Sequence, residues 1–375
     1  MHKIIVLGAG MVGSAMAIDL AKDHQVTVTD VSLTILDTLG KRAPQLTTQL
    51  LDVTKEKELK QTLSAFDLVI CAVPGFLGYQ TLQYIIECGK NVVDISFFPE
   101  DALTLHALAK EKGVTAIVDC GVAPGMGNII LGYYNEKMQI TDFECLVGGL
   151  PKVKKWPFCY KAPFSPVDVI EEYTRPARYV ENNQIITRPA LTDCEYVEFE
   201  EVGTLESFNS DGLRSILQTM AHIPNMKEKT LRYPGHVEYI KVLKSAGFFE
   251  EETMIINDTA IRPLDFTSKI LFNEWKLGPT EPELTVMRIS IKGQDSMGKE
   301  QEVIYSLYDE YDPESQTSSM ARTTGYTATA VANLFLKGIF TEKGVFPPEL
   351  IGKHEEVFHF VLNYLEERNV FYNMA

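Results

Sequence analysis

The amino-acid sequence predicts an α/β protein in which a doubly wound parallel sheet is followed by a second domain of the α+β type. Three observations lead to this prediction. Over the first 120 residues, short apolar runs rich in β-branched residues alternate with segments of helical periodicity. A glycine-rich turn follows the first run, and the regular alternation ends beyond Pro124. Alternating strands and helices imply crossover connections, which make a sheet parallel and cover both of its faces with helices.

In the first domain, strands are expected at residues 4–7, 26–29, 68–73, 92–95 and 115–118, where each apolar run has the length of a buried strand. Helices are expected at residues 12–21, 80–88 and 103–112, where apolar residues recur at helical spacing. Gly89 and Gly113 follow the last two of these segments. Glycine readily terminates a helix, so both residues are expected to mark helix ends.

The second domain shows strand patterns without regular crossover helices, at residues 143–147, 197–200, 284–291 and 302–308. This arrangement favours a mixed or largely antiparallel sheet. Residues 292–299 contain two glycines and predict a hairpin loop between the last two strands. A final helix is expected to begin with Thr323 as its cap and to run to Lys337 and Gly338.

The charge balance is acidic, because 35 Lys and Arg residues against 51 Asp and Glu residues leave a formal net charge of −16. Nucleic acids and anionic membrane surfaces are bound through basic side chains, so neither partner is expected. No apolar run approaches the roughly 20 residues that span a bilayer. The six cysteines show no Cys-x-x-Cys spacing and no histidine at a metal-ligand interval, which predicts buried thiols, a cytoplasmic location and no metal site.

The run Gly8-Ala9-Gly10-Met11-Val12-Gly13 follows a predicted strand and opens a predicted helix, which is the context of a Rossmann dinucleotide-binding turn. Gly8 would allow the tight turn, Gly10 would let a pyrophosphate approach the backbone, and Gly13 would permit close packing of helix on strand. The amides of the helix that opens at Met11 and Val12 would then face the phosphates.

Asp30 ends the second predicted strand, 17 residues after Gly13. An acidic residue at this position binds the ribose hydroxyls of NAD. A carboxylate there would repel the additional phosphate of NADP. NAD is therefore the expected cofactor, and NADP is the alternative.

Further strand ends are expected at the same edge of the sheet, because open parallel sheets bind ligands beyond the carboxyl ends of their strands. A third strand is assumed between residues 30 and 52, where no apolar run marks it. Asp52 would follow this strand and lie near the adenine, unless it is a solvated loop residue. Val73 and Pro74 follow the fourth strand and would lie along the nicotinamide ribose, unless they form only a tight turn. Asp94 closes the fifth strand, and its loop is expected at the same crevice.

The sixth strand ends at Asp119, and the loop from there to Asn128 contains three glycines and a proline. Such a loop either wraps backbone around a ligand or serves as a hinge between domains. Asp119 and Asn128 are the polar side chains at its two ends. Both are therefore candidate site residues.

Motifs along the whole chain resemble one known family. Besides the glycine-rich turn with Asp30, they are Val-Asp-Cys-Gly-Val-Ala-Pro-Gly-Met at 118–126, Val-Gly-Gly-Leu-Pro at 147–151, Phe-Ser-Pro at 164–166, Leu-Arg-Tyr-Pro-Gly-His at 231–236 and Met-Ala-Arg-Thr-Thr-Gly-Tyr at 320–326. In this order they resemble the saccharopine dehydrogenase family. That family includes the glutamate-forming saccharopine reductases and lysine 6-dehydrogenase.

The resemblance implies a dinucleotide-binding Rossmann domain (1–122), a substrate-binding and dimerisation domain (123–318) and a C-terminal helical segment (319–375) that returns to pack on the Rossmann domain. It also implies a homodimer that acts on a small amino acid. Saccharopine reductases carry an aspartate directly before the Pro-Gly of the glycine-rich loop, whereas this chain has Ala123 before Pro124 and Gly125. In the sequence of this loop, the chain is more similar to lysine 6-dehydrogenase than to the reductases. The whole chain is also shorter than the reductases, as lysine 6-dehydrogenase is.

The family's chemistry is hydride transfer between a nicotinamide and a carbon that bears nitrogen, so a substrate carboxylate must be held. Arg214, Arg232 and Arg322 lie in the resembling motifs and are the candidate carboxylate-binding residues, with Asn128 as a further substrate contact. Arg214 is the first choice for binding the carboxylate, because Asp211-Gly212 predicts a loop that opens a helix and could present this side chain. The alternative for each arginine is a solvated surface position.

Three side chains are candidates for moving a proton. His236 has an ordinary pKa near neutrality, but it could equally be a structural histidine. Lys161 would need a desolvated pocket, which neighbouring aromatic residues could provide. Asp119 could attract the substrate ammonium or simply cap a turn.

The expected function is that of an NAD(P)-dependent oxidoreductase acting on the C–N bond of lysine or a lysine-derived amino acid, of the lysine 6-dehydrogenase type. The nearest alternative is a glutamate-forming saccharopine dehydrogenase, followed by reductive formation of another amine such as a carboxylated polyamine. A non-catalytic NAD-binding regulatory protein is the alternative from a different class, because a fold does not dictate turnover.

Overall fold

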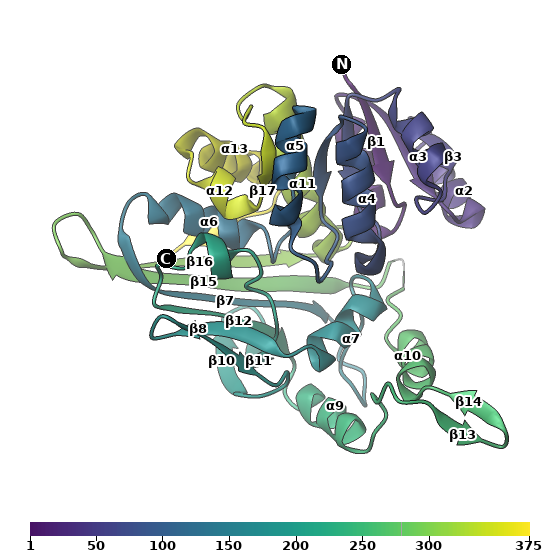
Figure 1. Cartoon of the computed structure of the whole chain (residues 1–375). Helices are drawn as coiled ribbons and strands as arrows, with labels where there is room; N and C mark the ends of the chain where they lie inside the picture. The colour runs from purple at the N-terminus through teal and green to yellow at the C-terminus, as the bar shows by residue number, and fades with distance from the viewer. Residues whose placement is uncertain (279) are drawn as a thin grey trace. The chain divides into compact units, whose positions relative to one another are not determined.

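The computed structural model describes residues 1–278 and 280–375, which form two compact units (Figure 1). The first unit comprises Met1–Ile140, Gly293–Gln301 and Met320–Tyr372. The second comprises Thr141–Lys292, Glu302–Ser319 and Asn373–Ala375. The first unit therefore continues beyond residue 122, the predicted end of the Rossmann domain, and includes the helix that follows the glycine-rich loop.

The first unit is built on a seven-stranded sheet whose strand order is β17-β6-β5-β4-β1-β2-β3. Every neighbouring pair in it is parallel. This order is that of the doubly wound dinucleotide-binding fold with one strand added at the edge, which confirms the predicted fold class. The strands are β1 (Lys3–Leu7), β2 (Gln25–Asp30), β3 (Thr47–Leu50), β4 (Leu68–Cys71), β5 (Asn91–Asp94), β6 (Thr115–Ile117) and β17 (Gly344–Phe346).

The helices of this unit are α1 (Met11–Leu20), α2 (Leu33–Arg42), α3 (Glu56–Leu63), α4 (Gly75–Glu87), α5 (His106–Lys112), α6 (Met126–Asn135), α11 (Ser319–Leu336), α12 (Pro348–Gly352) and α13 (Glu355–Glu366), and a short 3-10 turn, Ala102–Leu105, precedes α5. Figure 1 shows α4 and α5 on the same face of the sheet. Gly89 and Gly113 both adopt φ near +66° directly after α4 and α5, which confirms them as helix ends.

Two predicted helix starts are corrected. The helix predicted at residues 80–88 begins at Gly75, directly after Pro74, which ends the β4 turn. The last long helix begins at Ser319 rather than after Thr323. The hydroxyl of Thr323 donates to the carbonyl of Met320 (3.4 Å) inside the helix, so it does not cap the helix N-terminus.

The C-terminal segment belongs to the first unit, where β17 extends the sheet by pairing with β6. The short helix α12 packs directly on α6. A Cβ built at Gly132 would lie 2.1 Å from the carbonyl oxygen of Glu349, and one built at Gly352 would lie 2.3 Å from that of Ile129. The two backbones therefore touch, and each glycine is needed because no larger residue leaves room for the contact.

The second unit contains most of a nine-stranded sheet with the order β10-β11-β12-β7-β15-β16-β18, to which β8 and β9 are added beside β12. Strand β12 is parallel to β7 and antiparallel to β11, so the predicted mixed sheet is confirmed. The strands are β7 (Gln139–Pro151), β8 (Ala177–Glu181), β9 (Gln184–Arg188), β10 (Glu195–Phe199), β11 (Gly203–Asn209), β12 (Asn225–Arg232), β15 (Glu283–Gln294), β16 (Glu300–Glu310) and β18 (Tyr372–Met374).

The helices of the second unit are α7 (Pro166–Thr174), α8 (Ile216–Thr219), α9 (His236–Ser245) and α10 (Pro263–Glu274). A separate two-stranded sheet consists of β13 (Met254–Ile256) and β14 (Thr259–Ile261). The amide of Asp295 donates to the carbonyl of Lys299 (3.0 Å), so the predicted hairpin loop between β15 and β16 is confirmed. In the part of the chain described, no helix has the length and apolar character to cross a membrane.

Candidate functional site

The glycine-rich turn lies at the carboxyl end of β1 and opens α1. Gly8 has φ +106°, and a Cβ built there would lie 2.4 Å from the carbonyl oxygen of Ala72. A Cβ at Gly13 would lie 2.1 Å from the carbonyl oxygen of Gly8, whereas nothing lies within 4 Å of one built at Gly10. Gly8 and Gly13 are thus required by packing, and Gly10 leaves open space at the N-terminus of a helix. A pyrophosphate fits such a space, because unpaired amides and the helix dipole favour an anion there.

Asp30 is tied to this turn by its carboxylate. The amide of Ala9 donates to its Oδ2 and the amide of Ser32 donates to its Oδ1, each at 2.9 Å. Because the amide of Ala9 is part of the turn, the carboxylate is held next to the open space at Gly10. This is the position expected for a residue that binds the cofactor ribose.

The loop after β4 lies next to the glycine-rich turn, since Ala72 contacts Gly8 and is followed by Val73 and Pro74. Asp52 is differently placed. Its Oδ1 accepts hydrogen bonds from the hydroxyl of Thr54 (2.6 Å) and from the amide of Thr54 (3.0 Å), and these bonds lower the pKa of its carboxyl. Asp52 therefore caps its own turn, and its place near the adenine stays a prediction.

Two buried carboxyl groups lie at the ends of β5 and β6. Asp94 is fully buried, with its Oδ1 accepting from the amide of Ser96 (2.6 Å) and its Oδ2 without a hydrogen-bond partner in the described structure. Burial raises the pKa of Asp94 to about 7; the hydrogen bonds from Ser96 oppose this rise and the charge of Asp119 adds to it. Asp119 is itself buried, in a left-handed backbone conformation with φ +53°. A buried carboxyl group that titrates near neutrality, at the sheet edge expected to hold the nicotinamide, is a candidate acid–base group.

We expect the substitution Asp94→Asn to stabilise the protein more at pH 8 than at pH 5. The unfolded carboxyl loses its proton near pH 4, whereas the folded one keeps it until about pH 7. The stability of the native protein therefore falls as the pH rises from about 4 to 7, because the folded state disfavours the charged form. Asparagine stays neutral and avoids this loss. The increase in the free energy of unfolding caused by Asp94→Asn should therefore be larger at pH 8 than at pH 5, by at least about 1 kcal/mol.

Urea unfolding of both proteins at the two pH values measures this difference. The exposed Asp37 in α2 provides the control Asp37→Asn, which makes the same chemical change at a carboxyl group that is not buried. An equal effect of Asp94→Asn at both pH values would contradict the assignment of a raised pKa.

His236 begins α9 and is fully buried, which corrects its predicted role as a proton relay near neutrality. Its Nδ1 lies 2.9 Å from the carbonyl oxygen of Phe158, and its Nε2 lies 2.9 Å from the hydroxyl of Tyr173. A carbonyl can only accept, so Nδ1 carries the proton and Nε2 accepts from Tyr173. Burial, together with the charge of Arg232, lowers the pKa of His236 to about 3. It is thus a neutral structural residue.

Arg232 is also internal, and its predicted contact with substrate is not supported. Its side chain is 2% exposed and pairs with Glu172 at 2.5 Å. Its Nε donates to the hydroxyl of Tyr173 (3.2 Å), and its guanidinium carbon lies 4.4 Å from the centre of the Tyr160 ring. Lys161 does not occupy the desolvated pocket that a catalytic role requires, because it is partly exposed and its Nζ donates to the carbonyl of Glu274 (2.5 Å).

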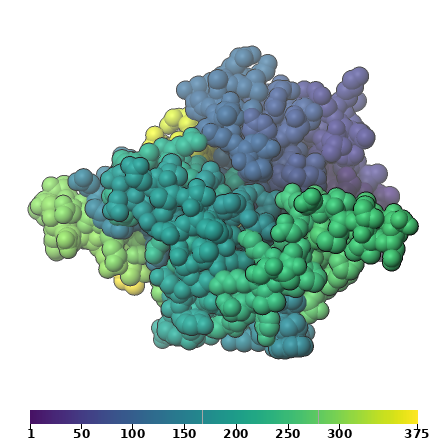
Figure 2. Space-filling model, turned by 60° about the horizontal axis from the view of Figure 1, so that its bottom comes forward, coloured from purple at the N-terminus to yellow at the C-terminus, as the bar shows by residue number. Residues whose placement is uncertain are grey.

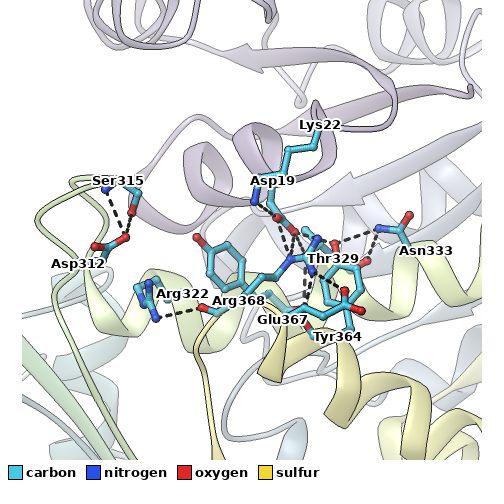
Figure 3. A network of polar contacts seen from close by, with 11 residues as sticks. Asp19, Lys22, Asp312, Ser315, Arg322, Thr329, Asn333, Tyr364, Glu367 and Arg368 are labelled. Carbon is cyan, nitrogen blue, oxygen red and sulfur yellow. Dashed lines mark hydrogen bonds and ion pairs between the residues drawn. The ribbon is translucent and has the colours of Figure 1, made fainter.

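Two further candidates have structural partners in the first unit. The amide nitrogen of buried Asn128 donates to Glu349 (2.9 Å) and its oxygen accepts from the amide of Gly125 (3.3 Å), so the side chain joins α6 to α12. Arg322 donates to the carbonyl of Arg368 (Figure 3) and to that of Asn369, both just beyond α13. Since a substrate would have to displace these contacts, we retain neither residue as a substrate contact.

Arg214 lies in the predicted loop, two residues before α8, with φ +47°. It belongs to a group of three arginines with Arg175, which pairs with Glu171, and Arg178, which pairs with Asp211. Arg178 binds Asp211 through two hydrogen bonds of 2.9 Å, and burial lowers the pKa of Arg175, as do the charges of Arg214 and Arg178 nearby. Arg175 and Arg178 were not among the predicted site residues, although the run Arg-Pro-Ala-Arg after α7 was an available signal. Closely spaced guanidiniums are suited to binding carboxylates.

Comparison with known families matches both parts of the chain. Residues 4–117 match the saccharopine dehydrogenase NADP binding domain, and residues 121–370 match the saccharopine dehydrogenase C-terminal domain. The structure is similar to that of apo saccharopine dehydrogenase (L-Glu forming) from Saccharomyces cerevisiae, with a TM-score of 0.81 and 19% identity, covering 100% of this chain and 99% of that one. At this identity, the likeness shows a shared fold.

Curated relatives match at low identity. The chain is 26% identical over 227 residues to the alpha-aminoadipic semialdehyde synthase of Arabidopsis thaliana, covering 56% of this chain and 21% of that protein. It is 25% identical over 284 residues to the saccharopine dehydrogenase (NADP(+), L-glutamate-forming) of Pyricularia oryzae, covering 72% and 62%. The chain thus spans about a fifth of the length of the first protein and about three fifths of the length of the second. A carboxyaminopropylagmatine dehydrogenase of Synechocystis sp. is 21% identical over 378 residues, covering 93% and 92%.

Proposed function

The chain belongs to the saccharopine dehydrogenase family, and on this premise we propose that it is a nicotinamide-dependent oxidoreductase acting on the C–N bond of lysine or a lysine-derived amino acid. The observation that carries the proposal is the edge of the first sheet, where open space at Gly10 adjoins the carboxylate of Asp30. A nicotinamide bound along this edge would accept the hydride. The chain's own residues would hold the cofactor through the first amides of α1 and through Asp30.

For the cofactor, we propose a preference for NAD over NADP. The family's domain is described as NADP binding. In this chain, however, the Asp30 carboxylate is fixed beside the turn by two backbone amides. A negative charge there would repel the 2′-phosphate of NADP, whereas it would accept hydrogen bonds from the hydroxyls of NAD.

For the substrate, we propose lysine, whose ε-carbon would give a hydride to the nicotinamide while the ammonium loses a proton; water would then hydrolyse the imine to the semialdehyde and release ammonia. The support is Ala123 in the loop after β6, where saccharopine reductases carry an aspartate. A carboxylated polyamine is the second candidate, because the relative that matches nearly end to end is named a carboxyaminopropylagmatine dehydrogenase. Saccharopine is the third, because a relative that covers 72% of this chain is named a saccharopine dehydrogenase (NADP(+), L-glutamate-forming).

The test is NADH formation by the purified protein with NAD and separate amines at alkaline pH. The amines are lysine, saccharopine, ornithine and carboxynorspermidine. Reduction with lysine alone supports the proposal, and reduction with only one of the others assigns the chain to that substrate. If NAD binds and none of the amines reduces it, the leading proposal is wrong and the non-catalytic alternative is favoured.

Within this proposal, Arg214 holds the substrate carboxylate. We expect Arg214→Ala to raise KM for the amine at least tenfold, because a charge-assisted hydrogen bond to a carboxylate contributes about 1.5–3 kcal/mol. Steady-state kinetics measures this change, with thermal unfolding to confirm that the variant is folded. Arg262→Ala removes an exposed arginine of the same unit and should leave KM unchanged. An unaltered KM in Arg214→Ala would exclude the residue from substrate binding.

A further inference from the structure

A buried polar cluster lies where β4, β5 and β6 end. Asp94, the last residue of β5, lies beside Cys71, the last residue of β4, and its carbonyl accepts from the amide of Cys120 (3.1 Å), which follows β6. Asp94 is 0% exposed, so it contributes nothing to the purple and blue surface that the N-terminal part of the first unit forms in Figure 2. Its carboxyl group is therefore inside the protein, at the carboxyl edge of the first sheet.

The carboxyl group of Asp94 has few groups to stabilise a charge. Its Oδ1 accepts from the amide of Ser96 (2.6 Å), whereas its Oδ2 has no hydrogen-bond partner in the described structure. Within residues 1–278 and 280–375, no cation pairs with it. A buried carboxylate without a cation is costly, and the neutral acid is much less so. The geometry therefore favours the protonated form of Asp94.

The neighbouring groups are acidic or neutral. Among the described residues, those that face Asp94 are the thiols of Cys71 and Cys120, the hydroxyl of Ser96 and the carboxyl of Asp119. From α4, the uncharged Gly78 packs on Ser96. Burial raises the pKa of both thiols, which keeps them neutral. Burial raises the pKa of Asp94 to about 7 and the charge of Asp119 adds to this rise, so Asp94 changes its charge between pH 6 and pH 8.

The order of the strands brings the nicotinamide half of the cofactor to this cluster. In the proposed cofactor site, Asp30 at the end of β2 holds the adenosine ribose, and the pyrophosphate lies at the glycine-rich turn after β1. The nicotinamide half must then extend to the other side of the turn, over β4 and β5. Backbone contacts continue in that direction. The carbonyl of Ala72 touches the turn, and the carbonyl of Cys71 accepts from the amide of Ile95 (3.0 Å).

We propose that Asp94 distinguishes the oxidised from the reduced cofactor by its charge, and that its ionised form favours NAD over NADH. The inference rests on the cofactor site of the proposed function. The nicotinamide ring is a cation in NAD and is neutral in NADH, so a negative charge near the ring favours NAD. The rest of the two cofactors is identical, and its contribution cancels in the ratio of their affinities. Asp94 is buried and acts on the ring through its charge alone.

Proton binding and cofactor binding are coupled as a result. As the pH rises from 6 to 8.5, Asp94 becomes ionised and the affinity for NAD rises relative to that for NADH. Two unit charges about 10 Å apart, at an effective dielectric constant of about 20, change a binding constant roughly tenfold. At alkaline pH the protein would therefore retain NAD and release NADH, which favours the oxidation of an amine.

Isothermal titration calorimetry of the full-length chain with NAD and with NADH tests the proposal, and it requires no substrate. In the native protein, the ratio of the dissociation constant of NADH to that of NAD should rise at least threefold from pH 6 to pH 8.5. In Asp94→Asn, the ratio should be the same at both pH values. The control Asp37→Asn, at the exposed surface of α2, should keep the native rise. A constant ratio in the native protein, or a native rise in Asp94→Asn, would overturn the proposal.

A count of released protons tests the same coupling in the native protein, so it does not depend on the folding of the variant. Titrations at pH 7 in buffers of different ionisation enthalpy should show that NAD releases more protons than NADH does. Equal release would contradict the role of Asp94. If neither cofactor binds, the proposed cofactor site is wrong and the role of Asp94 is wrong with it. If both bind with a ratio that does not depend on pH, only the role of Asp94 is wrong.

Discussion

Replacing Asp19 by alanine is expected to lower the free energy of unfolding of the first unit by about 3–5 kcal/mol, the usual cost of removing one partner from a buried ion pair. Asp19 lies in α1, the helix that begins at the glycine-rich turn, and is 2% exposed. The Nε of Arg368 donates to both of its oxygens, at 2.8 and 2.9 Å. The hydroxyls of Thr329 and Tyr364 each donate to Oδ2 at 2.7 Å (Figure 3).

This loss is large because the carboxylate joins three helical segments that are far apart in the sequence. Thr329 lies in α11, Tyr364 in α13 and Arg368 just after α13. Burial alone would raise the pKa of Asp19, but the charge of Arg368 and the hydrogen bonds from Arg368, Thr329 and Tyr364 together hold the pKa below its ordinary value. Asp19 is therefore ionised, and removing it leaves a nearly buried guanidinium without its partner.

Urea unfolding of Asp19→Ala, Arg368→Met and the double variant measures the coupling. The free energy of unfolding of the double variant should fall by less than the sum of the two single decreases. The difference should be at least about 1 kcal/mol, because the two side chains interact directly. Lys22→Ala removes the exposed cation that also contacts Asp19, and it should cost less than about 1 kcal/mol. Additive single losses would show that the ion pair contributes no coupling of its own.

The fold was predictable where its signals are local. Buried strands such as β1 and β4 are continuous apolar runs, so their pattern is visible in the sequence. The strand β3 was assumed but not located, because its residues Thr47–Leu50 are polar or exposed. The helix α2 was not predicted, although its two buried residues, Leu36 and Leu39, are three residues apart and so share one helix face.

The cofactor edge was predictable for a topological reason. Parallel strands bring their carboxyl ends to one edge, so Asp30 and the loop after β4 could be placed beside the glycine-rich turn from their order alone. The structure has both next to that turn. Asp94 and Asp119 close the neighbouring strands β5 and β6, and the charge of one affects the pKa of the other.

The substrate-side candidates were not predictable, because their burial depends on distant partners. Arg232 and His236 are enclosed by Tyr160 and Tyr173, which lie 59 to 76 residues earlier in the chain. Asn128 binds Glu349, 221 residues later. A sequence motif marks such residues as important, but it does not distinguish a ligand contact from an internal one.

The second large effect is expected in the glycine-rich turn. Substitution of one of its glycines should weaken NAD binding, and substitution of another should lower stability. We expect Gly10→Ala to fold like the native protein and to bind NAD at least tenfold more weakly, since the added Cβ meets no protein atom within 4 Å and enters the space for the pyrophosphate. We expect Gly13→Ala to be destabilised by about 1–3 kcal/mol or more, because its Cβ would lie 2.1 Å from the carbonyl oxygen of Gly8.

Thermal unfolding and NAD titration of the same samples separate the two effects. Gly40→Ala, in α2, is the matched control. Its Cβ would meet only a methyl group of Thr48, at 3.9 Å, so it should change neither NAD binding nor, beyond a slight gain, stability. Native-like NAD affinity in Gly10→Ala would show that the open space at α1 does not receive the pyrophosphate, and the proposed cofactor site would then be wrong. Native stability in Gly13→Ala would show instead that the turn can relax, which would remove packing as the reason for glycine at that position.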